Sequence, residues 1–358
     1  MTSSHCHLSD ETDSTLVAGS VFWLVEDECR GTRVLLRRYP NLRRVLVVGD
    51  SPCVGFSRAN TTSRGIDDPE SRKLWIFPVL LNYLFRHTPR VFFILENVQM
   101  APAQEDAISS TLGCQPVRLD AASFGPCSRP RLFWTNLPVA RLPTLTAQPS
   151  SILDPGWRPL WELCPIPGVA PPTSFATFTR PQPPGRPPEF PAPFWKLSLF
   201  CYSERSLVYN TRASPADLEQ VRSFLDSAIR VHTTGLRDRA SPALRARGAL
   251  ATWIHQQGGH RALRPLLHHE RDKALGFPHD ASALPDDVAT PDGFVWDRLQ
   301  ASGNSFAVPV LVFLLKPFAD HLLHETPLTP GPGRPPCSTR QEAIQALTPV
   351  YTHPNARR

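Results

Sequence analysis

Short, fully apolar runs alternate with helix-like segments in the first third of the chain, and this alternation limits the fold more than any other feature. The runs RRVLVVGD (43–50) and RVFFILENV (90–98) are typical of strands buried on both faces. The segments ESRKLWIFPVLLNYLFRH (70–87) and QEDAISSTLGC (104–114) carry apolar residues at helical spacing. The pattern predicts an α/β fold, with a parallel sheet covered by helices on both faces.

Three further segments extend this pattern. VFWLVEDE (21–28) predicts a strand that ends in acids, GTRVLLRRYP (31–40) a helix stopped by its proline, and RLFWTNLP (131–138) another strand. Pro78, inside the helical segment 70–87, predicts a kink or a helix boundary.

Proline sets the expected domain organisation. The 40 prolines of the 358 residues are about twice the usual share of ~5%. They cluster at 180–194 and 329–336, where they preclude a regular helix or a central strand. We therefore expect a loose amino terminus at 1–15, a core at 16–145, an irregular inserted region at 146–269, a return to the core at 270–325 and a mobile tail at 326–358.

The positive charge of the chain comes from arginine. The formal net charge is +6, and the only lysines are Lys73, Lys196, Lys273 and Lys316. The planar guanidinium group suits contacts to phosphates and base edges. A GC-rich genome would also enrich arginine and proline without any binding role, so both interpretations stay open.

Cysteine usage and hydropathy exclude several classes of protein. The 8 cysteines form no CxxC pair and no signal peptide precedes them, which argues against a disulfide framework and against a zinc site. The longest apolar run, 306–315, is shorter than the ~20 residues of a membrane span and contains a proline. We expect a protein of a reducing compartment, without a metal site or a membrane partner.

Polar residues follow both buried strands. The string DSPCVGFS places Pro52 and Cys53 directly after the strand 43–50, and Glu96 lies at the end of the strand 90–98. Functional groups of parallel sheets collect at these carboxyl ends, and a rigid proline can orient a thiol. An incidental buried cysteine and an acid at a helix amino terminus would produce the same letters.

Five strings in order carry a resemblance to a known family. They are SPC (51–53), ENV (96–98), RPRLFWTNLP (129–138), DKALGFP (272–278) and GNSFAVPV (303–310). This set resembles the DNA cytosine-5 methyltransferases, in particular their animal de novo branch. The resemblance covers about half the chain and implies a Rossmann-like methyltransferase sheet, with the region 146–269 as an inserted target-recognition region.

The resemblance implies a covalent mechanism. Carbon 5 of cytosine becomes nucleophilic only after a group adds to carbon 6, and Cys53, fixed by Pro52, matches the family thiol that does so. Glu96, followed by Asn97, matches the acid that protonates or holds N3 of the ring.

Two arginines complete the implied catalytic set. Arg131 matches the family arginine that contacts O2 of the base and the catalytic carboxylate, and Arg129 would supply a second cation. Without the resemblance, such a pair is usually a solvated basic edge.

The implied partner is double-stranded DNA with the target cytosine flipped out of the helix. The segment after Cys53 would close on the DNA, with Arg58 and Arg64 available for phosphates; an ordinary surface loop is the alternative. FATFTR (175–180) resembles the threonine-rich segment of the recognition region, which implies DNA contacts for Thr179 and Arg180.

The implied methyl donor is S-adenosylmethionine. Glu26, or a neighbouring acid by a slip of register, would end the strand 21–28 and hold the ribose hydroxyls. Asn304, Ser305 and Phe306 match the late motif that lines the same pocket. The glycine-rich turn that opens the family pattern is not found upstream of residue 21.

Loss of that turn keeps a second hypothesis open, namely an inactive homologue that acts as a DNA-binding or partner-binding scaffold. The third alternative is an unrelated α/β protein with chance motifs. The resemblance also implies homo-oligomers, or hetero-oligomers with related methyltransferase subunits, and a nuclear location. The compact, Pro/Arg-rich sequence favours capture of the gene by a large DNA virus, with the host nucleus as its setting.

Overall fold

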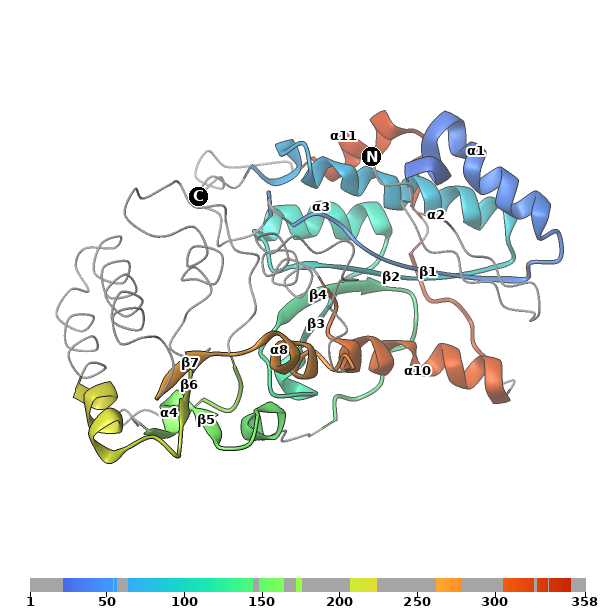
Figure 1. Ribbon diagram of the computed structural model, residues 1–358. Helices are drawn as coiled ribbons and strands as arrows, with labels where there is room; N and C mark the ends of the chain where they lie inside the picture. The colour runs from blue at the N-terminus through green and yellow to red at the C-terminus, as the bar shows by residue number, and fades with distance from the viewer. Residues whose placement is uncertain are drawn as a thin grey trace, which may run out of the picture. The chain divides into compact units, whose positions relative to one another are not determined.

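The structure is a computed structural model of residues 1–358 (Figure 1). The residues that it describes are 22–53, 55–56, 64–143, 148–163, 172–175, 207–223, 262–278, 305–324, 327–333 and 335–348, with the backbone alone at 22–28, 207, 265 and 268. Two compact units divide the chain. Unit 1 comprises Met1–Leu119, Pro130–Ala140 and Leu314–Arg358, and unit 2 comprises Asp120–Arg129 and Arg141–Phe313.

A four-stranded sheet forms the centre of unit 1. Its strands are β1 (Arg44–Asp50), β2 (Arg90–Val98), β3 (Val117–Asp120) and β4 (Pro130–Thr135), in the order β1-β2-β4-β3. β1 runs parallel to β2, whereas β4 runs antiparallel to it. The expectation of an all-parallel sheet is therefore wrong and the sheet is mixed. A strand buried on both faces has the same apolar pattern in either direction, so the sequence did not reveal the reversal.

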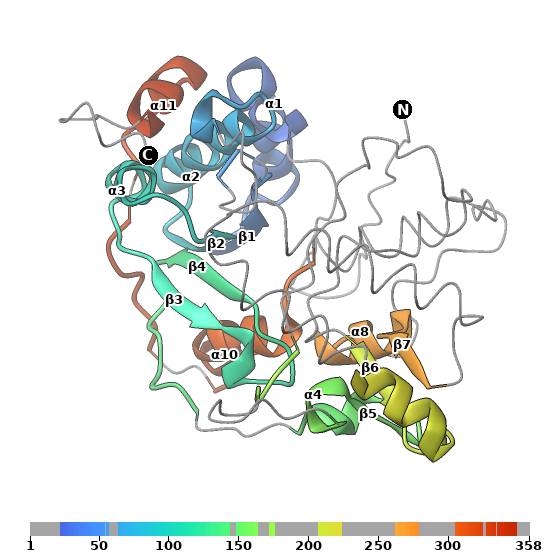
Figure 2. The same ribbon diagram turned by 90° about the vertical axis from the view of Figure 1, so that its left-hand side faces the viewer.

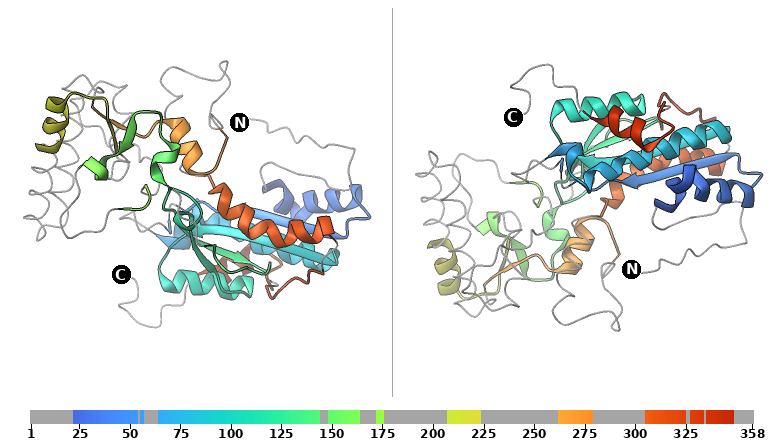
Figure 3. Two further views of the ribbon diagram at one scale, coloured as in Figure 1. Left: turned by 90° about the horizontal axis from the view of Figure 1, so that it is seen from below. Right: turned by 90° about the horizontal axis from the view of Figure 1, so that it is seen from above.

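Helices cover both faces of this sheet, as predicted. Successive residues of a strand point to opposite faces. The ring of Phe93 meets Phe77 of α2 (Ile76–His87) edge-on at 6.1 Å, and the ring of Phe92 meets Phe318 of α10 (Val308–His324) at 5.2 Å. Figures 1 and 3 show α2 and α10 on opposite sides of β2. The fold is thus α/β, with β2 at the centre of the core.

The segment expected to be a strand at 21–28 is part of helix α1 (Phe22–Arg38). Cys29 and Thr32 are buried and Leu36 packs on the core, a spacing that matches a helix face. The short apolar start of this segment imitated a strand, but the helical period continues to residue 38. Glu26 consequently lies inside a helix rather than at a strand end, and the ribose-binding role expected of it is withdrawn.

Two helices agree with the predictions. A short 3-10 helix, η2 (Ser71–Trp75), leads into α2, and Pro78 lies in the first turn of α2, where a missing N–H costs nothing. α3 (Pro102–Leu112) ends at Gly113, whose φ of 69° is the left-handed conformation common after helices.

The tail expected to be mobile contains a packed helix, α11 (Arg340–Leu347). Its Ala343 and Leu347 are buried against the core of unit 1. Thr339 and Glu342 form a capping box at its start. Figure 2 shows α11 on the same side of the sheet as α1, α2 and α3. The prolines at 329–336 concealed this helix signal just beyond them.

Unit 2 contains a small antiparallel sheet of β5 (Trp157–Pro159), β6 (Leu207–Asn210) and β7 (Leu263–Pro265). The short helices α4 (Leu160–Leu163) and α8 (His268–Ala274) belong to the same unit. The expected return to the core at residue 270 is wrong, because unit 1 resumes inside α10, at Leu314. Among the described residues, no helix has the length and apolar character needed to span a membrane.

Candidate active site at the carboxyl ends of β1 and β2

The register of β1 and β2 places the two predicted reactive residues at one end of the sheet. Asp50 at the end of β1 pairs with Glu96 near the end of β2. Cys53 follows Asp50 by three positions and is partly exposed, with its sulfur present as a thiol rather than in a disulfide. The parallel pairing of the two strands thus brings Cys53 and Glu96 to the same end of the sheet.

A buried hydrogen bond joins the ends of these two strands. Nδ2 of Asn97 donates to Oγ of Ser51 over 2.6 Å, and Oδ1 of Asn97 accepts from the N–H of Val98 over 2.7 Å. Asn97 and Ser51 are both buried. Asn97 therefore acts as a positioning residue, because it fixes the chain just before Pro52 and Cys53.

A second brace spans Cys53 from the other side. Oγ of Ser71 donates to the carbonyl oxygen of Pro52 over 3.1 Å and accepts from the N–H of Gly55 over 2.8 Å. The Ser71 side chain is fully buried, and its own N–H donates to Oδ1 of Asp68 over 3.0 Å. One hydroxyl thus holds the peptide groups before and after Cys53.

Sequence reasoning missed Ser71. Its partners lie 16 and 19 positions earlier in the chain, and a serine at the start of a short 3-10 helix has no periodic or motif signal. Only the tertiary contact marks it as part of the site.

Two glycines close the base of the segment that follows Cys53. The N–H of Gly65 donates to the carbonyl oxygen of Gly55 over 2.6 Å, and a Cβ on Gly55 would clash with the carbonyl oxygen of Gly65. Gly65 itself has a φ of 59°, which favours glycine. Arg64 is exposed beside this base, whereas Arg58 lies outside the described residues.

Glu96 and Arg131 form a nearly buried ion pair. Nε of Arg131 lies 2.6 Å from Oε1 of Glu96, and the two side chains are 12% and 9% exposed. Glu96 pairs with Phe133 of β4, so Arg131, two residues earlier, projects from the same face of the sheet. The predicted acid and cation are therefore adjacent, at the same end of the sheet as Cys53.

The other predicted site residues divide between unit 2 and the part of the chain outside the description. Arg129 lies in unit 2, where it is buried and its backbone N–H donates to Oδ1 of Asp120 over 2.6 Å. Ser305 and Phe306 also lie in unit 2, partly buried just before α10. Thr179, Arg180 and Asn304 lie outside the described residues.

The residues expected to hold the methyl donor lie in separate parts of the chain. Glu26 lies in α1, and α1 leads directly into β1, the end strand of the described sheet. The assignment of these residues to S-adenosylmethionine therefore stays a proposal that rests on the sequence resemblance, and we derive no step through the donor.

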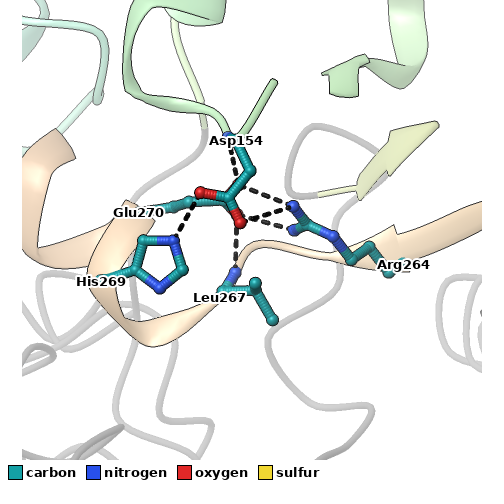
Figure 4. A network of polar contacts seen from close by, with 5 residues as sticks. All are labelled: Asp154, Arg264, Leu267, His269 and Glu270. Carbon is teal, nitrogen blue, oxygen red and sulfur yellow. Dashed lines mark hydrogen bonds and ion pairs between the residues drawn. The ribbon is translucent and has the colours of Figure 1, made fainter. Parts of the chain in front are cut away.

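Unit 2 contains a separate polar network, drawn in Figure 4. Both oxygens of Glu270 accept hydrogen bonds from the guanidinium of Arg264 over 2.7 Å. They also accept from the backbone N–H groups of Asp154 and Leu267, over 3.0 and 2.8 Å. His269 contacts Oδ1 of Asp154 over 2.8 Å.

This network is structural. Ligand atoms of Asp154, His269 and Glu270 lie within 4.8 Å of one another, a spacing that a metal ion could use. However, Arg264 already supplies the positive charge, and it also stacks over the ring of Trp157 at 4.1 Å. The network connects the segment before β5 with β7 and α8.

Two solved structures are remotely similar to the chain. No family model matches the chain. The solved structure of the Entamoeba histolytica methyltransferase EhMeth is 14% identical, over 81% of this chain and 80% of that chain, with a TM-score of 0.45. The S. pombe Dnmt2 methyltransferase is 16% identical, over 76% of this chain and 78% of that chain, with a TM-score of 0.38. Both TM-scores are below 0.5, so the α/β class rests on the elements described above.

Proposed function

We propose that the chain is a DNA cytosine-5 methyltransferase in which Cys53 is the nucleophile. The observation that supports this best is the set of residues at one end of the sheet: a partly exposed thiol with a braced backbone, at the same end as the nearly buried pair of Glu96 and Arg131. The ordered strings SPC, ENV and RPRLFWTNLP favour this family over other uses of a thiol and an acid.

The proposed reaction begins with addition to the ring. The thiolate of Cys53 forms a bond from Sγ to C6 of cytosine, and the electron pair of the C5–C6 double bond moves toward C5. C5 thereby becomes the nucleophile, and the thiol proton has left to solvent. The braces on Pro52 and Gly55 fix the backbone on both sides of Cys53, which limits the positions from which its thiolate attacks.

Glu96 and Arg131 control the charge that develops on the ring. Addition at C6 makes N3 more basic, and we assign to Glu96 the transfer of the proton at N3. Arg131 keeps the Glu96 carboxyl in one orientation and places a fixed cation beside the base.

S-adenosylmethionine would supply the methyl group, and double-stranded DNA in the nucleus would be the substrate. Arg58, Arg64, Thr179 and Arg180 are proposed to contact that DNA. These assignments rest on the resemblance in sequence.

Two modified duplexes test the proposal. Cytosine with a nitrogen at position 5 has a more electrophilic C6, so it reports thiol addition without any donor, whereas 5-fluorocytosine with S-adenosylmethionine reports addition and methyl transfer together. We expect a denaturation-resistant adduct with both duplexes, lost in Cys53→Ala and kept in Cys114→Ala. A protein that binds both duplexes and forms neither adduct would refute the covalent mechanism.

A second candidate function is a non-catalytic scaffold that binds DNA or a partner subunit. The direct passage from α1 into β1, with Glu26 inside the helix, favours it, because the donor-binding half has no counterpart in the described residues. The duplex whose cytosine has a nitrogen at position 5 is the donor-independent duplex. An adduct with this duplex alone would indicate a chain that activates cytosine but depends on another subunit for the donor.

A further inference from the structure

Six exposed arginines gather at the end of the unit 1 sheet that is opposite Cys53. We call them the arginine surface: Arg37, Arg38, Arg43, Arg44, Arg86 and Arg90. They come from the ends of α1 and α2, the starts of β1 and β2, and the connections between them. Because β1 and β2 are parallel, both connections lie at the same end of the sheet, as Figure 1 shows.

This concentration of charge opposes folding. Arg44 and Arg90 are direct partners in the register of β1 and β2, and like charges opposite each other destabilise a sheet. The sequence has no Asp or Glu at 29–49 or at 74–95. Among the described residues, no carboxylate forms an ion pair with any member of the arginine surface.

The helix dipole accounts for only some of these arginines. Arg37 and Arg38 lie in the last turn of α1, and Arg86 lies in the last turn of α2, where a cation favours the helix dipole. Arg43, Arg44 and Arg90 precede or begin strands, so the dipole gives no reason for them.

We propose that the arginine surface binds the phosphate backbone of nucleic acid, at a place separate from the base that enters the active site. The guanidinium group forms paired hydrogen bonds with phosphate oxygens, and a surface of one sign attracts a uniformly charged polymer. The seven residues of β1 span roughly 20 Å at about 3.3 Å each, so the phosphates bound here belong to a segment remote from Cys53.

An acidic peptide fits this surface less well. Protein interfaces depend on apolar or aromatic anchors in their centre. The exposed residues between the arginines are Pro40, Asn41, His87 and Pro89, and the ring of the only partly exposed Tyr39 is already covered by Arg38 at 5.9 Å. The identity of the polymer as DNA rests on the proposed function, whereas the surface itself does not.

The test uses the full chain with Arg43→Gln, Arg44→Gln and Arg90→Gln combined. The probe is a fluorescent duplex of A·T pairs only, which has no cytosine for Cys53, and binding is measured by anisotropy between 50 and 200 mM salt. We expect the slope of log affinity against log salt to fall by about 2.7, because each phosphate that an arginine no longer neutralises removes about 0.9 from the slope.

The matched control combines Arg72→Gln, Arg118→Gln and Arg158→Gln. The side chains of these arginines are 43%, 58% and 57% exposed, and each has a carboxylate partner. Their substitution removes the same total charge as the first triple variant. An equal change of slope in both triple variants would overturn the proposal, as would no change in either. Displacement of the duplex from the wild type by poly-glutamate at equal charge concentration would instead indicate an acidic protein partner.

Two further readouts separate this inference from the proposed function. One outcome is that the wild type forms no adduct with the modified cytosine duplexes, while the Arg43/Arg44/Arg90 variant still has the smaller salt slope. The catalytic proposal then fails and the proposal for the arginine surface is supported. The other outcome is that the Arg43/Arg44/Arg90 variant forms the adduct at the wild-type rate and keeps the full salt slope. The proposal for the arginine surface then fails, while the catalytic proposal is unaffected. Circular dichroism melting checks that both triple variants are folded.

Discussion

Arg131 and Glu96 face each other across neighbouring strands at 2.6 Å, with almost no access to solvent. In a nearly buried pair each charge depends on the other, because neither is hydrated. We predict that Arg131→Met lowers the free energy of unfolding by roughly 3 to 5 kcal/mol, as measured by urea denaturation. Adding Glu96→Gln should recover much of this loss; strictly additive losses would show that the pair is not coupled.

Glu96→Gln alone tests the chemical role. The amide keeps the size of the side chain but cannot transfer a proton. We expect turnover of duplex DNA to fall by about 10²- to 10⁴-fold, the range of a general acid or base, with the Kd for DNA nearly unchanged. If Kd and turnover change by the same factor, Glu96 binds substrate rather than moving a proton.

Ser71→Ala removes the brace around Cys53. We expect a stability loss of about 1 to 3 kcal/mol, since two backbone groups lose their partner. Adduct formation with the donor-independent duplex should slow by at least about tenfold, because a small displacement of a reacting atom is costly.

The control for this variant is Ser109→Ala. Ser109 is also a buried serine with two hydrogen bonds, from Trp134 and to the carbonyl of Glu105. It should lose similar stability while forming the adduct at the wild-type rate. Equal slowing in both variants would mean that Ser71 acts only through stability.

Cys114 predicts a pH dependence of stability. Burial raises the pKa of its thiol from 9.0 to about 11. A group whose pKa is raised on folding favours the folded state below the unfolded value and loses that contribution as pH rises to the folded value. The urea midpoint should therefore fall between pH 9 and about 11, and fall less in Cys114→Ala. An identical decline in both proteins would exclude this thiol as a cause.

The network in unit 2 predicts indifference to metal. The guanidinium of Arg264 donates to both carboxylate oxygens of Glu270, so EDTA or added Zn²⁺ should leave the midpoint of thermal unfolding unchanged. Arg264→Met should lower it clearly, because Glu270 is fully buried. A Zn²⁺-dependent rise in the midpoint of the wild type would require a different account of Asp154, His269 and Glu270.

The sequence predicted those parts of the site that depend on local pattern. Fully apolar runs located β1 and β2, and their parallel pairing brings the segment of Cys53 to the same end as Glu96. The ENV string identified Asn97, whose positioning bond to Ser51 became visible only in the structure.

The remaining features depend on contacts distant in sequence or on signals with two meanings. The direction of β4 and the role of Ser71 are set by tertiary partners. The start of α1 matches a strand pattern and a helix pattern equally, so the sequence wrongly predicted that Glu26 ends a strand. In the tail, the clustered prolines led to the prediction of a mobile segment, although Thr339 and Glu342 form the capping box of a helix.

Unit 1 is assembled from the beginning and the end of the chain, and this has a consequence during synthesis. Nδ2 of Asn82 in α2 donates to the carbonyl of Cys337, 255 positions later, and α11 follows directly. At translation rates of about 5 to 20 residues per second, the apolar surface of α2 waits roughly 10 to 50 s for its cover. Over that interval the residues of α2 that pack on α11 stay uncovered, and exposed apolar surface of this kind favours aggregation of an incomplete chain.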